Sequence, residues 1–396
     1  MHLLDILRVF LRLGLTSFGG PAAHIGYFHR EFVQQRQWVN DQQFNGWLAI
    51  CQALPGPASS QLGFLIGWHR KGLAGALMAW LGFTLPSALI LTAIAAYGLT
   101  TSNPWAEPII HGLKIVAIAV VAQAVLSMFS SLCRHWQTRV LAALGFGLAL
   151  SIAGWHGQFL SMALGALAGM TLLRHLSSAK AALAPTISHC PSPSQGLVLL
   201  LVFLALLLGL PWVANTQPAL NLFDTFYRGG ALVFGGGHVV LPLLESATVG
   251  AGTVQESDFL AGYGLAQAMP GPLFTFSAWL GIFDSQVGGW LGAGIALVAI
   301  FLPGLLLIIG VLPWWQWLSK EETAMAALLG VNASVVGILA AAWVNPILLT
   351  SVRSAADFII AALMTVLLIW RKSPVWLVVI LAPALTLALH LLRDLT

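Results

Sequence analysis

Long apolar segments recur along the whole chain and are separated by short polar stretches. Each apolar run of about 17 residues or more is long enough to cross the hydrocarbon core of a bilayer as a helix. The runs are continuous and do not alternate with polar positions, which favours α-helices over the strands of a β-barrel. The pattern predicts membrane spans near residues 73–99, 108–132, 139–155, 158–174, 196–213, 287–315, 323–343, 355–371 and 374–392.

The chain also repeats itself at an offset of about 216 residues. Phe18-Gly19-Gly20-Pro21 matches Phe234-Gly235-Gly236-Gly237, and the block QALPGP at residues 52–57 matches QAMPGP at residues 267–272. The same register aligns Phe10 with Phe226, Arg12 with Arg228 and Gly14 with Gly230. Farther on, at offsets one and two residues longer, Leu85-Pro86 matches Leu302-Pro303 and Gly112 matches Gly330. These blocks predict an N-terminal repeat over residues 1–175 and a C-terminal repeat over residues 215–396. A cytoplasmic linker and one connecting transmembrane helix fill residues 176–214.

The loop charges predict that the two repeats have opposite orientations. Loops rich in Lys and Arg stay in the cytoplasm. In the first half, loop 29–41 carries Arg30 and Arg36, and the next loop carries Arg70 and Lys71. The matching loops of the second half, 245–258 and 283–286, hold four acidic residues and no Lys or Arg. The resulting path has a cytoplasmic N-terminus and a periplasmic C-terminus.

Two basic loops on one side also constrain the segment between them. Residues 42–68 number 27, whereas two full crossings need about 40. This segment is therefore predicted to enter and turn back as two half-helices, and residues 258–283 to do so from the opposite face. The predicted fold class is an all-α polytopic membrane protein of two inverted-topology repeats with re-entrant broken-helix hairpins. The Phe18 and Phe234 segments are left open between hairpins and full spans.

Composition supports a membrane protein and limits the classes of function. The chain is 58% hydrophobic and 8% charged, whereas soluble proteins carry about 25% charged residues, so the lipid bilayer is the expected partner of its surface. The net charge of +4 fits basic loops that hold the topology and does not indicate a nucleic-acid partner. The cysteines show no metal-ligand spacing, and no Walker motif or Ser/His/Asp arrangement is present. We expect no cofactor, no metal and no enzymatic activity, and transport driven by a gradient.

The two Pro-Gly-Pro blocks are the first candidates for substrate binding. Proline ends a helix and glycine lets the backbone turn, so the outgoing half-helix presents free N–H groups and a positive dipole end. In inverted-repeat transporters such breaks lie near the bilayer midplane. The candidate residues are Gln52, Pro55, Gly56, Pro57, Ser59 and Ser60 in the first half, and Gln267, Pro270, Gly271, Pro272, Thr275 and Ser277 in the second. The alternative is that each block only kinks a membrane helix.

The glycine runs are the second pair of candidates. A run of N–H groups at Gly19 and Gly20, and at Gly235, Gly236 and Gly237, has the chemistry to cradle an oxyanion. Close packing of helices is the alternative.

Charged residues at membrane depth are costly and are usually functional. Arg12 and Arg228 align across the repeat, and a guanidinium fits a tetrahedral oxyanion. Snorkelling of Arg12 and an ion pair of Arg228 with Asp224 are the alternatives. Lys114 is a third basic candidate.

Histidines are the candidates for proton coupling, because an imidazole gains or loses a proton near neutral pH. His24 and His238 each follow a glycine motif, and His111 lies near Lys114. A packed or interfacial histidine is the alternative for each of them.

With these motifs the chain resembles the chromate ion transporter family, in its long-chain, two-domain bacterial form. Phe18-Gly19-Gly20-Pro21 with His24, the stretch 54–58, Phe234 to His238, and residues 269–272 carry the resemblance over nearly the full length. It implies export of chromate across the bacterial inner membrane, chromate resistance, coupling to the proton gradient, and competition by sulfate.

The residues themselves indicate only an inverted-repeat anion transporter that works by alternating access. Another oxyanion such as sulfate, uptake in place of export, an anion channel, and a membrane enzyme acting on a lipid phosphate are the alternatives. Monomer and homodimer are both left open.

Overall fold

The computed structural model describes residues 2–97, 105–152, 154–176, 187–234 and 237–394. Every regular element in this part of the chain is a helix. The first half contains α1 (Leu3–Thr16), α2 (Gly20–Phe28), η1 (His29–Gln35), α3 (Asp41–Ala53), α4 (Ala58–Tyr97), α5 (Ala106–Leu132), α6 (Trp136–Ser151), α7 (Trp155–Leu172) and η2 (Arg174–Leu176). The connecting helix is α8 (Pro193–Ala214).

The second half begins with α9 (Pro218–Ala231), η3 (Gly237–Val239), α10 (Val240–Leu244), η4 (Glu245–Val249), α11 (Glu256–Ala268), η5 (Leu273–Thr275) and α12 (Phe276–Phe283). It continues with α13 (Gly289–Val311), η6 (Leu312–Trp314), α14 (Trp315–Leu318), α15 (Glu322–Ala342), η7 (Trp343–Leu348), α16 (Leu349–Ser351), α17 (Ala355–Ile369) and α18 (Val375–Asp394).

Each predicted span overlaps one or more of these helices over its described residues. Within the described part of the chain, six helical segments are long and apolar enough to cross a membrane, and they begin with α4, α5, α8, α13, α15 and α18. The molecule is therefore a multi-pass membrane protein. α6, α7 and α17 have 16, 18 and 15 residues and are not among these six, so their crossing of the bilayer stays a prediction.

The chain breaks its helices at the two kinds of repeated motif. α1 ends before Phe18, and Gly19 and Gly20 have φ values of 100° and 74°, which a glycine adopts without strain. α3 ends at Ala53, and Gly56 has φ 122° before α4 begins. In the second half α11 ends at Ala268 and Gly271 has φ 98°. Entry and return of these pairs from one face of the membrane stays a prediction.

The long helix α4 consists of two helices joined by a sharp turn. Lys71 and Gly72 have non-helical backbone angles, and beyond them the chain folds back so that Gly67 and Gly75 pack backbone to backbone. Gly281 and Gly292 make the same contact between α12 and α13. Glycines are required at both crossings because neither leaves room for a Cβ.

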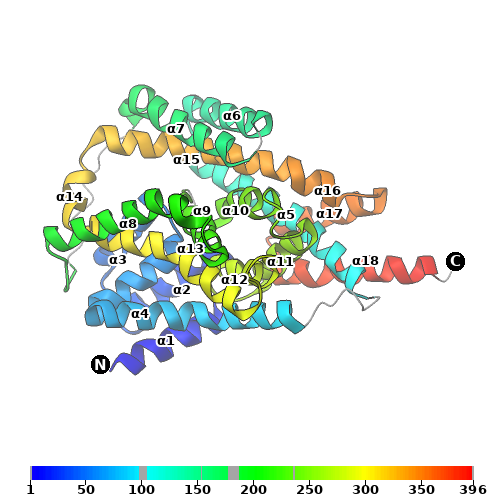
Figure 1. The fold of residues 1–396 in the computed structure, drawn as a ribbon, viewed down its shortest axis with the longest axis horizontal. Coiled ribbons are helices and arrows are strands. Elements are labelled where there is room, and N and C mark those ends of the chain that lie inside the picture. The colour runs from blue at the N-terminus through cyan, green and yellow to red at the C-terminus, as the bar shows by residue number, and fades with distance from the viewer. Residues whose placement is uncertain (1, 98–104, 153, 177–186, 235–236, 395–396) are drawn as a thin grey trace.

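The two halves interlock. α1 packs along α4 in the first half, and α9 packs along α13 in the second. In contrast, α15 of the second half packs on α6 and α7 at one edge of the molecule, and α5 of the first half packs on α17 and α18 (Figure 1). α5 of the first half and α15 of the second are thus each covered by helices of the other half. Separation of the halves would expose both of these helices.

The outer surface is apolar. α8 is largely uncovered by the rest of the protein, and its residues Leu201 and Leu208 are 55% and 65% exposed. In water such a surface would drive aggregation, whereas in a bilayer it faces a solvent of matching polarity.

Candidate functional site

The helix breaks of one half meet those of the other half through two backbone hydrogen bonds. The N–H of Gly56 donates to the carbonyl of Val233 at 2.7 Å, and the N–H of Gly271 donates to the carbonyl of Ser17 at 3.0 Å. Ser17 and Val233 each precede a Phe-Gly-Gly motif and align across the repeat. Gly56 and Gly271 also align across the repeat, so the two contacts join equivalent positions of the two halves. We call this meeting point of Ser17, Gly56, Val233 and Gly271 the central site.

Each Pro-Gly-Pro block also rests on a long helix of the other half. A Cβ on Gly56 would lie 3.1 Å from the Cα of Gly304 in α13. A Cβ on Gly271 would lie 2.8 Å from Ser87 Oγ and 3.2 Å from the carbonyl of Phe83, both in α4. Positive φ and this close approach together require glycine at positions 56 and 271.

Gln61 fixes the first break in place. Its Nε2 donates to the carbonyls of Pro55 at 2.9 Å and Gly304 at 3.0 Å, so one side chain ties the break to α13. Both partners are acceptors, which fixes the orientation of the amide. Gln61 Oε1 therefore faces away from them, and it has no hydrogen-bond partner among the described residues although the side chain is fully buried.

Several other buried polar atoms near the breaks lack a partner within the described part of the chain. They are Ser17 Oγ, Ser60 Oγ, Thr84 Oγ1, Gln267 Nε2 and Ser277 Oγ. A buried polar atom without a partner costs about 1–3 kcal/mol, so native structures keep few of them. Unpartnered atoms of the same kind also occur elsewhere in the described residues, for example at Gln158 and Asn332. Those near the breaks have the chemistry to bind water or a polar ligand. Thr275 differs, because its hydroxyl donates to the carbonyl of Pro272 at 2.8 Å.

His24 is part of this arrangement. It is 1% exposed and packs edge-on against Phe83. Its Nε2 lies 3.2 Å from the carbonyl of Ser17, and its Nδ1 lies 3.4 Å from Ser59 Oγ. A carbonyl only accepts, so Nε2 carries the hydrogen and Nδ1 of the neutral ring accepts from Ser59.

His238 contacts the second break less directly. Its Nδ1 lies 3.0 Å from the hydroxyl of Tyr263 in α11. Tyr263 and Gln267 lie one turn apart on α11, the helix that ends at the second break.

The two aligned arginines are both engaged in ion pairs. Arg12 donates to Glu31 at 3.0 Å with its side chain 62% exposed, and Glu31 also binds Arg36. Arg228 pairs with Asp224, whose side chain is fully buried. The role of Arg12 and Arg228 in substrate binding stays a prediction.

The remaining predicted residues are distributed as follows. Pro55, Pro57, Ser59, Ser60, Pro270, Pro272, Thr275, Ser277 and Gly237 are buried near the breaks, whereas Gln52 and Gly19 are exposed and Gly20 is half-buried. Gly235 and Gly236 lie outside the described residues.

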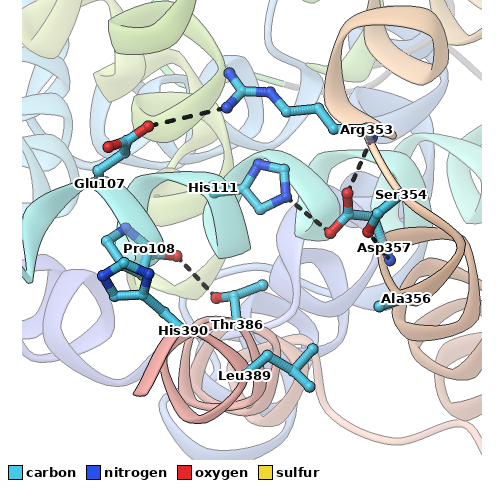
Figure 2. Close-up of a pocket in the computed structure, with 10 residues that line it drawn as sticks. All are labelled: Glu107, Pro108, His111, Arg353, Ser354, Ala356, Asp357, Thr386, Leu389 and His390. Atoms are coloured by element: carbon cyan, nitrogen blue, oxygen red, sulfur yellow. Dashed lines mark hydrogen bonds and ion pairs between the residues drawn. The ribbon is translucent and has the colours of Figure 1, made fainter. Parts of the chain in front are cut away.

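His111 and Lys114 lie elsewhere, on α5. His111 Nε2 bonds Asp357 Oδ1 at 2.9 Å and lines a cavity of about 340 Å³ together with Glu107, Arg353 and Thr386 (Figure 2). Lys114 lines an adjoining cavity of about 550 Å³. Neither cavity is lined by Ser17, Gly56, Val233 or Gly271.

The chromate transporter family model matches residues 4–170 and 220–387. The chain belongs to the chromate transporter family. Three relatives are similar in sequence to this chain over most of their own length. A chromate transport protein of Pseudomonas aeruginosa is 28% identical over 95% of this chain and 89% of its own. A chromate transport protein of Cupriavidus metallidurans is 27% identical over 93% and 88%. A probable chromate transport protein of Synechococcus elongatus is 27% identical over 85% and 83%. No solved structure matches the chain significantly.

Several polar residues in or near the central site were not predicted from the sequence. Ser17, Gln61, Thr84 and Ser87 were not singled out because their counterparts in the second half carry no matching group; Gln61, for example, aligns with Phe276. A signal was nevertheless present, since Gln61 follows Ser60 directly in an otherwise apolar stretch.

Proposed function

We propose that this member of the chromate transporter family exports chromate from the bacterial cytoplasm across the inner membrane and thereby confers chromate resistance. The central site is the proposed substrate site. The observation that carries this proposal is the pair of reciprocal hydrogen bonds, Gly56 to Val233 and Gly271 to Ser17, which gathers the repeated motifs around unpartnered buried hydroxyls.

Chromate is held there mainly by neutral donors. Ser60 and Ser277 follow the two breaks, and the first N–H groups of α4 have no partner within their own helix. A dianion in a low-dielectric site gains more from several fixed donors than it does in water. Arg12 and Arg228, each six residues before a Phe-Gly-Gly motif, add positive potential from farther out.

Transport proceeds by alternating access. The two repeats are inserted in opposite orientations, so that a two-fold axis lies in the membrane plane and passes through the central site. The N-terminus is cytoplasmic and the C-terminus periplasmic. Rocking of one repeat against the other opens the central site to each side of the membrane in turn. In this motion Gly56 moves away from α13, and Gly271 moves away from α4.

The proton gradient drives export through His24. Protonation of Nδ1 turns it from an acceptor into a donor, which removes the hydrogen bond from Ser59 and changes which group Ser59 can bind. Ser59 lies at the start of α4, beside Ser60. Proton binding at His24 therefore alters the donors that face the substrate.

The test is chromate flux in everted membrane vesicles with an imposed proton gradient, with and without excess sulfate. Gradient-dependent chromate accumulation that Ser60→Ala lowers at least tenfold is expected. Ser130→Ala is the matched control, because the Ser130 hydroxyl is exposed and bonds only Ser127 of its own helix. Flux of sulfate but not chromate, or full flux in Ser60→Ala at normal expression, would contradict the proposal.

A further inference from the structure

Lys114 is a buried cation that lies in the field of the carboxylates of Glu256, Asp258 and Glu107 but forms no ion pair with them in the described structure. It lies two turns into α5 and is 7% exposed. Among the described residues it makes no hydrogen bond and no ion pair within 4.0 Å. An ammonium group offers three donors, and burial of such a charge is costly unless acceptors surround it. The side chain lines a cavity of about 550 Å³, which gives it room for a ligand.

A second cation faces the same cavity. Arg353 lies on the loop before α17 and lines both this cavity and the adjoining one of Figure 2. Its only ion pair in the described structure is with Glu107 at 4.0 Å, and both side chains are largely exposed, so that pair contributes little. Arg353 and Lys114 line the same cavity. These two cations favour an anion between them, whereas the carboxylates of Glu107 and Asp258, which line the same cavity, oppose one.

Three carboxylates line the two cavities, and each has a different environment. Asp357, in the adjoining cavity, accepts from His111 and from the backbone N–H of Arg353, both at 2.9 Å. Glu107 lines both cavities, but its side chain is 87% exposed and its charge is screened by solvent. Asp258 lies in the first turn of α11, where the helix dipole favours a carboxylate, and lines the cavity without an ion pair to Lys114. Of the two carboxylates that line this cavity, Asp258 is the less exposed, and its negative charge opposes the binding of an anion.

The geometry points to a second oxyanion site in this cavity, in which Lys114 and Arg353 bind a small tetrahedral dianion. We call it the vestibule. The residues that line it include none of Ser17, Gly56, Val233 and Gly271, so it is a different place from the central site. Gly264 of α11 packs against the backbone of Leu113, the neighbour of Lys114. The vestibule would concentrate the oxyanion at one mouth of the transport path.

This inference rests on the proposed function only for the identity of the ligand. The test is binding of radiolabelled chromate, and separately of radiolabelled sulfate, to the purified full-length protein by equilibrium dialysis. A Ser60→Ala/Ser277→Ala background weakens the central site. In that background Lys114→Met is expected to weaken the remaining binding at least tenfold, and Lys114→Arg to retain most of it.

The direction in which Asp258→Asn changes anion binding decides between an anion site and a structural ion pair. If the vestibule holds an anion, removal of this carboxylate tightens binding. If Lys114 and Asp258 are only a loose structural pair, both variants lose thermal stability and neither changes binding in this way. Lys71→Met is the matched control, because it removes one positive charge from an exposed turn of α4.

Binding that Lys114→Met leaves unchanged, or that Asp258→Asn weakens, would overturn the inference. Should Lys114→Met fail to fold, Asp258→Asn still decides by its direction. Anion binding that depends on Lys114, in a protein without chromate flux, would support the vestibule and refute the proposed function. Chromate flux with binding independent of Lys114 would do the reverse.

Discussion

At the scale of single residues, the central site consists mostly of neutral groups. The two arginines that align across the repeat are held by carboxylates of their own half, Glu31 and Asp224. The hydroxyls of Ser17, Ser60 and Ser277 are buried without partners in the described structure. Neutral donors bind an anion without the desolvation cost of a buried ion pair. They also hold it less tightly, and release of the substrate is a requirement of the proposed transport.

The Arg228–Asp224 pair predicts a stability effect that must be separated from binding. Arg228→Ala leaves the fully buried Asp224 carboxylate without its partner and is expected to cost about 3–5 kcal/mol. The double variant Arg228→Ala/Asp224→Asn removes both charges and should recover most of that loss, measured as the thermal unfolding midpoint in detergent. Chromate flux of the stable double variant then reports whether the guanidinium itself binds substrate. Equal unfolding midpoints for the single and double variants would refute the stability argument.

His24 predicts a change in proton dependence without loss of the site. Glutamine keeps a donor for the Ser17 carbonyl but does not titrate, so His24→Gln should keep chromate binding within about threefold. Chromate flux should then no longer respond to an imposed pH gradient. His135→Gln, in an exposed position before α6, is the control and should behave like the wild type. Retention of the full pH response in His24→Gln would exclude this histidine as the coupling group.

At the scale of elements, glycine contacts decide how closely the helices approach. The turn at Lys71 and Gly72 lets the first part of α4 lie against the second, and α12 meets α13 in the same way. Each Pro-Gly-Pro block lies against the middle of a long helix of the other half. The breaks are thus held from outside their own segments, by the packing of α4 and α13.

Gly56→Ala tests this support. A Cβ at position 56 would lie 2.8 Å from Gln61 Nε2 and 3.1 Å from the Gly304 backbone, at a φ of 122° that alanine rarely adopts. We expect a loss of about 2–4 kcal/mol in stability and little chromate flux. Gly26→Ala in α2 is the control, since a Cβ there would have no neighbour within 4 Å and the φ of Gly26 is ordinary. Wild-type stability and flux in Gly56→Ala would show that the contact with α13 is dispensable.

At the scale of the whole molecule, the halves are interlocked. α5 is covered by α17 and α18, and α15 by α6 and α7, so each half completes the core of the other (Figure 1). Two hydrogen bonds also join loops that the predicted membrane topology places on the same side. Trp68 and His69 of the turn in α4 bond the linker at His189 and Ser188, and the path places all four in the cytoplasm.

The native cysteines allow the predicted topology to be tested directly. Cys190 is exposed in the linker, whereas Cys51 and Cys133 are buried. A membrane-impermeant thiol reagent should therefore label the protein in everted vesicles, where the cytoplasmic face is outward, and leave it unlabelled in right-side-out vesicles. Cys190→Ser should abolish the label and so identify its site. Labelling confined to right-side-out vesicles would invert the predicted orientation.

The helical class, the positions of the long helices and the internal repeat can all be read from the sequence. Apolar runs and backbone-breaking residues are local signals, and in lipid every backbone group must be satisfied within its own segment. The positions of the breaks followed from Gly19, Gly56 and Gly271 for the same local reason. Only the tertiary structure decided which break meets which. The crossing of Gly56 to Val233 and Gly271 to Ser17 joins residues far apart in the chain, and no local pattern encodes that pairing. The partners of Arg12, the role of Gln61 and the cavity at Lys114 likewise depend on packing between helices, because burial and charge pairing are properties of neighbours in space.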